Sequence, residues 1–185
     1  MAESRNDKVN ILHRMKKSFI IMSELASAPY EYIFKRVLDD LVDLGDQFPV
    51  TVIYCKAMQW IGYGYQLARE ILGDKFYAGE PSPETARVVM FHSSMEGKMT
   101  LANLQKSPDQ CSLRLVFASV ALGMGADLRH VERVIHTGPP STLETYIQEV
   151  GRCGQTGTRV HAILYYNNSD LANQHMQASM KDFCV

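Results

Sequence analysis

The chain has 185 residues, enough for one domain with a sizeable buried core. Lysine and arginine number 19 and aspartate and glutamate 20, so the formal net charge of -1 excludes a globally basic protein, and any site for a polyanion must be local. No apolar run approaches the ~20 residues that span a bilayer, and the N-terminal residues lack the hydrophobic centre of a signal peptide. We therefore expect an intracellular protein with no membrane partner.

The cysteines indicate reduced thiols. No two of the four are separated by two residues, which disfavours a complete zinc site or a disulfide framework. They are Cys55, Cys111, Cys153 and Cys184.

Strand-like runs alternate with helical patterns along the chain. Each run is continuously apolar instead of strictly alternating, as is typical of parallel strands covered by helices on both faces. The pattern predicts an α/β fold with three layers, in which a mostly parallel sheet is flanked by helices. The expected strands are 51–55, 87–91, 113–119, 133–137 and 160–166.

The helix predictions rest on apolar spacing and on capping residues. Apolar residues recur at helical spacing over 30–44 and 59–72. Capping boxes, in which a serine and a glutamate three residues later satisfy each other's main-chain N–H groups, predict helix starts at 93–96 and 141–144. Gly151 is expected to end the second of these helices, which places Arg152 in the turn beyond it. The segment 168–183 predicts one amphipathic terminal helix.

A complete nucleotide-hydrolysis site is absent from the sequence. The glycine-lysine pair Gly97–Lys98 does not fit the phosphate-binding loop pattern, since His92 stands where that pattern needs its first glycine and Met99 where it needs a hydroxyl. Nor is there a nucleophile with a base at a characteristic spacing.

A glycine-rich turn follows the run 113–119. Gly123 and Gly125 allow the main chain to approach a ligand closely, and the carboxylate of Asp127 could accept hydrogen bonds from a ribose. Two glycines alone are weak evidence, and by themselves they are better explained by a tight strand-to-helix connection.

The segment from His136 strengthens the functional interpretation. It reads HTGPPSTLETYIQEVGRCGQTG, and before it stands VFASVALGMGAD at 116–127. These stretches resemble the sixth and fifth motifs of the second RecA-like domain of RecQ-family DNA helicases, H-x-x-x-P-x-x-x-E-x-Y-x-Q-E-x-G-R-A-G-R-D-G and V-V-A-T-x-A-F-G-M-G-I-D. The residues that match the sixth motif are His136, Pro140, Glu144, Tyr146, Gln148, Glu149, Gly151, Arg152, Gly154 and Gly157.

The resemblance implies half of an ATP site. In such helicases ATP and Mg²⁺ lie between two RecA-like domains, and the first domain carries the phosphate-binding loop. Arg152 would contact the γ-phosphate, and Asp127, Gly125 and Gln148 would bind the nucleotide. The pattern's second arginine is here Gln155, an uncharged residue, so weak hydrolysis is expected even beside a competent first domain.

The resemblance also implies DNA as a partner. Ser119, Gly123 and Met124 would contact the DNA backbone during 3′ to 5′ unwinding, in a role connected with DNA repair or recombination in the nucleus of a eukaryote. The alternatives are a decayed helicase domain that binds nucleic acid or protein without ATP turnover, which Gln155 favours, and half of a DEAD-box-like RNA helicase. The latter fits less well because its H-R-x-G-R is here Gln148 to Arg152.

The resemblance divides the chain into three parts. Residues 1–28 would be an arm from an absent first RecA-like domain, 29–167 the C-terminal RecA-like domain, and 168–185 a helix leading into a truncated zinc module. Cys184 would be a single zinc ligand without the partners that a tetrahedral site needs, so no metal is expected in this chain. Alone, the chain is expected to be inactive as an ATPase.

Overall fold

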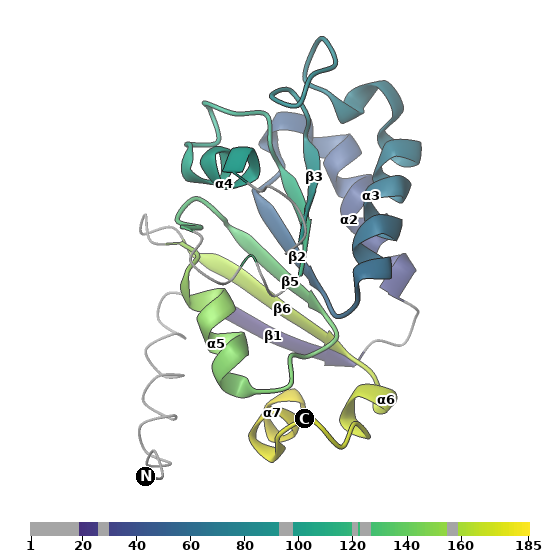
Figure 1. Ribbon diagram of the computed structural model, residues 1–185, viewed down its shortest axis with the longest axis vertical. Coiled ribbons are helices and arrows are strands. Elements are labelled where there is room, and N and C mark those ends of the chain that lie inside the picture. The colour runs from purple at the N-terminus through teal and green to yellow at the C-terminus, as the bar shows by residue number, and fades with distance from the viewer. Residues whose placement is uncertain (1–18, 26–29, 93–97, 120–121, 123–126, 155–158) are drawn as a thin grey trace.

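The computed structural model describes residues 19–25, 30–92, 98–119, 122, 127–154 and 159–185 (Figure 1). In these ranges six strands form one sheet in the order β1-β6-β5-β2-β4-β3, and every neighbouring pair is parallel. The strands are β1 (Phe19–Leu25), β2 (Thr51–Cys55), β3 (Val88–Phe91), β4 (Leu115–Ala118), β5 (Arg133–Thr137) and β6 (Val160–Tyr166).

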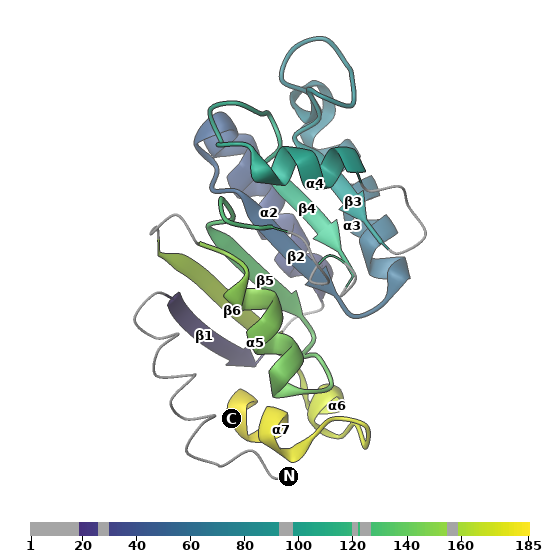
Figure 2. The ribbon, with the colours of Figure 1, turned by 60° about the vertical axis from the view of Figure 1, so that its left-hand side comes forward.

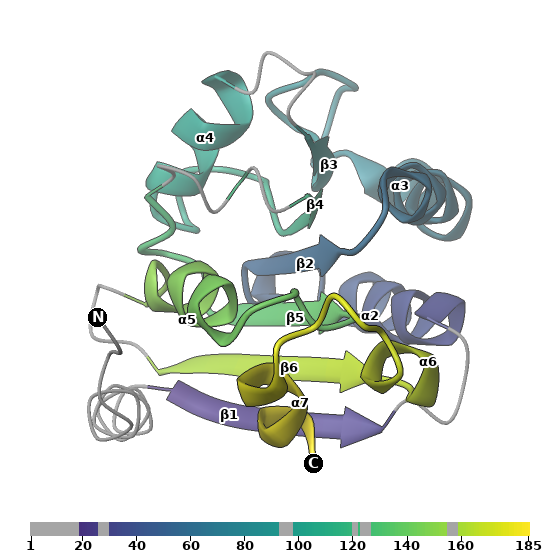
Figure 3. The same cartoon turned by 60° about the horizontal axis from the view of Figure 1, so that its bottom comes forward.

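Helices cover both faces of this sheet, which confirms the three-layer prediction. Two long helices lie on one face and two shorter ones on the other, as Figure 3 shows. The first pair is α2 (Tyr30–Leu44) and α3 (Met58–Leu72), and the second pair is α4 (Lys98–Gln105) and α5 (Leu143–Gly151). Short 3-10 helices η1 (Gly45–Gln47) and η2 (Gly73–Phe76) follow α2 and α3, and α6 (Asn168–Leu171) and α7 (Ala178–Cys184) follow β6.

The hydrophobic core lies on both sides of the central strands. All residues of β2 and β4 are buried, because α2 and α3 cover one face and α5 with its flanking loops covers the other. Double coverage explains why these strands are continuously apolar. None of the helices in the described part of the chain combines the length and apolar character needed to cross a membrane.

The edge strand β1 was not predicted. It lies within the segment 1–28 that was interpreted as an arm, and it pairs with β6 from Phe19 opposite Val160 to Leu25 opposite Tyr166. Figure 2 shows β1 beside β6 at the border of the sheet. The proposed domain boundary at 28–29 remains a prediction, but the sheet of the described domain includes residues that precede it.

The prediction of one helix over 168–183 was wrong. The segment forms α6 and α7, separated by residues that are not helical. Asn167 and Asp170 form a capping box that starts α6, and the side chain of Asn173 then accepts a hydrogen bond from the N–H of His175. Short amide and carboxylate side chains compete in this way with helical hydrogen bonds, which accounts for the interruption.

The start of α5 also differs from the prediction by one residue. The cap is Thr142, whose hydroxyl accepts the N–H of Thr145 at 3.1 Å, and Ser141 lies outside the helix. Gly151 is the last helical residue, and the positive φ expected near the helix end belongs to Gly154, at 66°. The other predicted capping box, at 93–96, lies outside the described residues.

Two glycines of α3 provide a matched test of how closely this helix packs on the sheet. A Cβ on Gly64 would lie 2.4 Å from Cε1 of Phe117, whereas nothing lies within 4 Å of a Cβ on Gly62. The ring of Phe117 also packs edge-on against Phe34, with the centroids 5.2 Å apart, so it cannot easily move. We expect Gly64→Ala to lower the free energy of unfolding by about 1–3 kcal/mol through overpacking.

Gly62→Ala is the control for this prediction. Alanine favours a helix over glycine by up to about 1 kcal/mol, so this variant should be as stable as the parent chain or more stable. Urea unfolding followed by circular dichroism measures both. Equal stabilisation by the two substitutions would show that Gly64 does not contact the sheet as described.

Candidate functional site

An isolated parallel bridge joins the two segments that carry the helicase-like motifs. Leu128, in the connection from β4 to β5, pairs with Cys153, two residues after the end of α5. The bridge therefore joins the segment that begins with Asp127 to the segment that follows Arg152. The sequence analysis assigned both residues to one nucleotide.

Arg152 lies directly after α5 and is half-buried. Its main chain is still helical, with φ -83° and ψ -12°. Its Nε is buried without a hydrogen-bond partner. The guanidinium lies close enough to Tyr54 for its positive charge to act against the rise in the pKa of that phenol. Arg152 takes part in none of the ion pairs found among the described residues.

Asp127 has a local partner. Its carboxylate accepts hydrogen bonds from Nε of Arg129 at 2.8 Å and from the Arg129 N–H at 3.2 Å, and it also pairs with the Arg129 Nη2. Hydrogen bonding to Arg129 is the main cause that lowers the pKa of this carboxyl. The acceptor is thus ionised and oriented, but a ribose would have to share it with Arg129.

The structure describes only some of the other predicted site residues. Ser119 is half-buried after β4, and its N–H donates to the carbonyl of Phe91 at 3.0 Å. Gln148 is exposed on α5. Gly123, Met124, Gly125 and Gln155 lie outside the described residues.

Cys184 ends α7 and is buried, and burial raises the pKa of its thiol to about 11. No cluster of three or more potential metal ligands occurs in the ranges that the structure describes. A single buried thiol does not fit a structural zinc ion, which needs four ligands.

A buried polar cluster beneath α5 was missed by the sequence analysis. Nε2 of His136, on β5, lies 2.7 Å from Oε2 of Glu149, on α5, and both residues are 2% exposed. The imidazole stacks on the ring of Tyr54, from β2, with centroids 4.9 Å apart, and its centroid lies at the same distance from that of Tyr146. The partner of His136 lies 13 residues away on another element, which no local spacing indicates.

This cluster has unsatisfied hydrogen-bonding capacity. The hydroxyls of Tyr54 and Tyr146, Nδ1 of His136 and Oε1 of Glu149 are buried without partners. Burial is the largest of the causes that raise the pKa of Tyr54 far above its ordinary value, so the phenol is neutral. Buried polar groups usually have partners, and exceptions point to a functional role or to a bound molecule.

The cluster lies at a cavity of about 300 Å³. The cavity opens where β2 and β5 end and α5 begins, and we call it the switch-point cavity. Its lining includes Tyr54, Lys56, His136, Pro139, Ser141 and Glu149.

A second polar network holds Lys56 at this cavity. Its Nζ lies 2.6 Å from Oδ1 of Asp170, whose other oxygen accepts the hydroxyl of Tyr30 at 2.6 Å and the N–H of Asn167 at 3.0 Å. The carboxylate is 6% exposed and Lys56 is 41% exposed. Asp170 therefore ties α6 to the end of β2 and to the start of α2, while the ammonium group remains accessible to solvent.

The parallel sheet, its two helical layers and the joined motif segments define a RecA-like helicase domain. The sequence comparisons agree: residues 34–157 match the family described as helicase conserved C-terminal domain. The chain belongs to this family, and within it to the RecQ-like C-terminal domains.

Individual relatives support this assignment. The human ATP-dependent DNA helicase Q4 is 32% identical over 133 residues, covering 70% of this chain and 10% of the relative. A putative ATP-dependent DNA helicase Q1 from Caenorhabditis briggsae is 39% identical over 88 residues, which is 48% of this chain and 14% of that protein. The chain thus spans about a tenth of the length of these curated relatives.

Solved structures confirm the fold. A DEAD box protein from Methanococcus jannaschii superimposes with a TM-score of 0.59 at 18% identity, covering 97% of this chain and 48% of that one. The RNA helicase Prp28 from Chaetomium thermophilum, bound to ADP, gives 0.60 at 21% identity over 83% of this chain and 34% of that one. At these identities the likeness concerns the fold alone.

Proposed function

We propose that this chain is the C-terminal lobe of a RecQ-like ATP-dependent DNA helicase that unwinds DNA in the 3′ to 5′ direction. In this proposal it supplies half of an ATP and Mg²⁺ site, together with a first RecA-like domain, and part of the DNA-binding surface. The observation that carries the proposal is the bridge between Leu128 and Cys153, because it joins the segment that begins with Asp127 to the one that follows Arg152. The half-buried Arg152, which forms no ion pair among the described residues, supports the same role.

The proposed mechanism depends on stabilising the negative charge of the phosphoryl group during its transfer. Phosphoryl transfer is accelerated when cations stabilise the charge on the transferring group, and a guanidinium contributes most when its position is fixed beforehand. Arg152 would meet the γ-phosphate held by the first domain, and Asp127 would accept a ribose hydroxyl. Ser119, with Gly123 and Met124, would couple the closing of the cleft to the DNA backbone.

Gln155 provides the test of this proposal. An arginine finger contributes about 10³–10⁵ in rate, so the uncharged Gln155 should leave hydrolysis weak. We expect the chain alone to show no ATPase activity, and a protein that joins it to a RecQ-type first domain to show weak DNA-stimulated activity. In the joined protein, Gln155→Arg should raise turnover at least tenfold, as measured by phosphate release with and without single-stranded DNA.

The control is Gln155→Lys, which adds the charge without the forked geometry of a guanidinium and should give a smaller gain. Arg152→Gln in the joined protein should remove most of the remaining activity. If Gln155→Arg leaves turnover unchanged while DNA binding persists, the second candidate is favoured, a helicase-derived module that binds nucleic acid or protein without hydrolysis. The uncharged residue at 155 is the observation in favour of that candidate.

A further inference from the structure

The switch-point cavity lies where parallel α/β folds usually bind ligands. After β2 the chain passes through α3 to β3, on one side of β2 in the sheet, and after β5 it passes through α5 to β6 on the other side. The two strands are neighbours and α3 and α5 cover opposite faces (Figure 3). Such a divergence opens a crevice at the carboxyl ends of the strands, which is the usual ligand position in open α/β sheets.

The chemistry of the cavity limits what can occupy it. Three of its lining residues, Tyr54, His136 and Glu149, each carry a polar atom that is buried without a partner: the hydroxyl, the ring nitrogen Nδ1 and the carboxylate oxygen Oε1. The carboxylate disfavours a simple anion there. The exposed ammonium of Lys56 at the mouth disfavours a simple cation.

A ligand that combines a neutral polar ring with an attached anion would suit both the inner wall and the mouth of the cavity. The edges of nucleobases carry hydrogen-bond donors and acceptors together, as the inner wall requires. A phosphate would lie at the mouth, beside Lys56 and the positive end of α5, where Thr142 caps the helix. The volume of about 300 Å³ is at the lower end for ligand sites and suits one nucleotide better than a peptide.

We propose that the switch-point cavity binds one nucleoside monophosphate unit, with the base toward Tyr54, His136 and Glu149 and the phosphate at Lys56. This inference deepens the proposed function by adding a base-accepting site to the DNA-binding surface, and it rests on that function for the source of the ligand. It does not depend on Arg152 or on ATP. A strand of DNA and a free mononucleotide share this chemistry.

Tyr54→Phe separates a binding role from a structural one. The substitution removes a hydroxyl that has no partner in the protein and keeps the ring that stacks on His136. Removing an unsatisfied buried hydroxyl should leave the melting temperature unchanged or raise it. Binding of the full chain to fluorescein-labelled oligothymidylate, measured by anisotropy without ATP, should weaken about fivefold, the effect of one lost hydrogen bond.

An abasic oligonucleotide of the same length tests whether the base enters. The parent chain should bind it more weakly than oligothymidylate, and Tyr54→Phe should remove most of that difference. Thymidine monophosphate as a competitor distinguishes the sources: competition that depends on Tyr54 shows that free nucleotides also bind, and its absence restricts the site to a DNA strand. Equal binding of the two oligonucleotides by the parent chain would overturn the proposal.

Lys56→Gln and Tyr30→Phe form a second, matched pair. Each removes one donor from the carboxylate of Asp170, but only Lys56 lines the cavity. Lys56→Gln should weaken oligothymidylate binding at least threefold and Tyr30→Phe should not, because only the former removes a contact to phosphate. If both variants weaken binding equally, or if Tyr54→Phe binds like the parent chain, the cavity is not a nucleotide site.

Discussion

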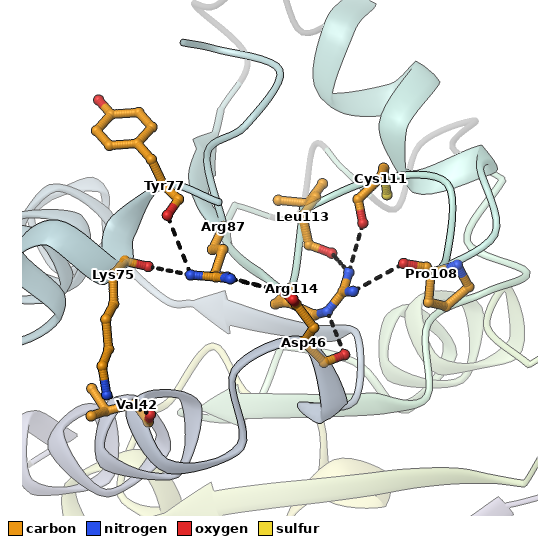
Figure 4. A network of polar contacts seen from close by, with 9 residues as sticks. All are labelled: Val42, Asp46, Lys75, Tyr77, Arg87, Pro108, Cys111, Leu113 and Arg114. Atoms are coloured by element: carbon orange, nitrogen blue, oxygen red, sulfur yellow. Dashed lines mark hydrogen bonds and ion pairs between the residues drawn. The ribbon is translucent and has the colours of Figure 1, made fainter. Parts of the chain in front are cut away.

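Arg114→Ala should lower the free energy of unfolding by about 3–5 kcal/mol, because it removes several buried hydrogen bonds from a charged donor, each of which contributes about 1.5–3 kcal/mol at most. Arg114 is 4% exposed, and its guanidinium donates to the main-chain carbonyls of Asp46, Pro108, Cys111 and Leu113 at 2.9–3.1 Å (Figure 4). The substitution leaves all four carbonyls without this donor. Urea unfolding measures the loss.

Added ethylguanidinium should restore part of this stability. It replaces the atoms that the substitution removes, and a ligand that binds only the folded state stabilises it by mass action. At about 20 mM, far below denaturing concentrations, it should raise the melting temperature of Arg114→Ala but not of the parent chain. Ethylammonium, a cation that lacks the planar guanidinium group, is the control for the effect of added salt.

Arg36→Ala, at an exposed position of α2, is the control for the loss of a positive charge and should change stability by less than about 0.5 kcal/mol. Failure of ethylguanidinium to act on Arg114→Ala, together with a small loss of stability, would show that the carbonyls find other partners.

The neighbouring Arg87 is held by a different set of acceptors. It donates to the carboxylate of Asp46 at 2.9 Å and to the carbonyl of Lys75 at 2.8 Å (Figure 4).

Glu149→Ala is expected to lower the free energy of unfolding by about 3 kcal/mol. The substitution removes the partner of Nε2 of His136, and both residues are buried where water cannot replace the lost hydrogen bond. Glu149→Gln keeps a side chain that can hydrogen-bond to the imidazole and should lose about 1 kcal/mol. Denaturant unfolding at neutral pH compares the three chains.

The double variant His136→Leu/Glu149→Met distinguishes a lost partner from a lost packing contact. Buried pairs replaced by apolar residues of similar volume are often neutral in stability, so the double variant should be more stable than Glu149→Ala alone. If it is instead as unstable as the sum of the two single losses, packing of these two side chains accounts for the effect. The hydrogen bond would then contribute little.

Much of the fold could be predicted from the sequence, because a strand that is buried on both faces appears as a continuous run of apolar residues. The five continuous apolar runs all became strands, with bounds such as Thr51–Cys55 as predicted, and the helix Tyr30–Leu44 begins and ends where its spacing indicated. By contrast, β1 follows a basic segment, and its pairing with β6 depends on a partner at the far end of the chain. No local pattern contains that information.

The candidate site was predictable only where it follows a motif. Arg152 and Asp127 were predicted because they lie in the sixth and fifth motifs, and their roles remain predictions. The competing partner of Asp127, Arg129, became visible only in the structure. The contact between His136 and Glu149 and the ion pair between Lys56 and Asp170 both join residues from separate elements. The parallel topology determines these contacts, and spacing along the sequence does not indicate them.

The position of β1 also affects how the chain folds. During synthesis the earlier part of a chain emerges first, yet β1 finds its neighbour only when β6 is available. Pairings of such long range close slowly, because a large loop must be ordered before any hydrogen bond forms. The outer border of the sheet should therefore be completed last on the folding pathway, and until then the unpaired side of β6 would be open to strands of other molecules.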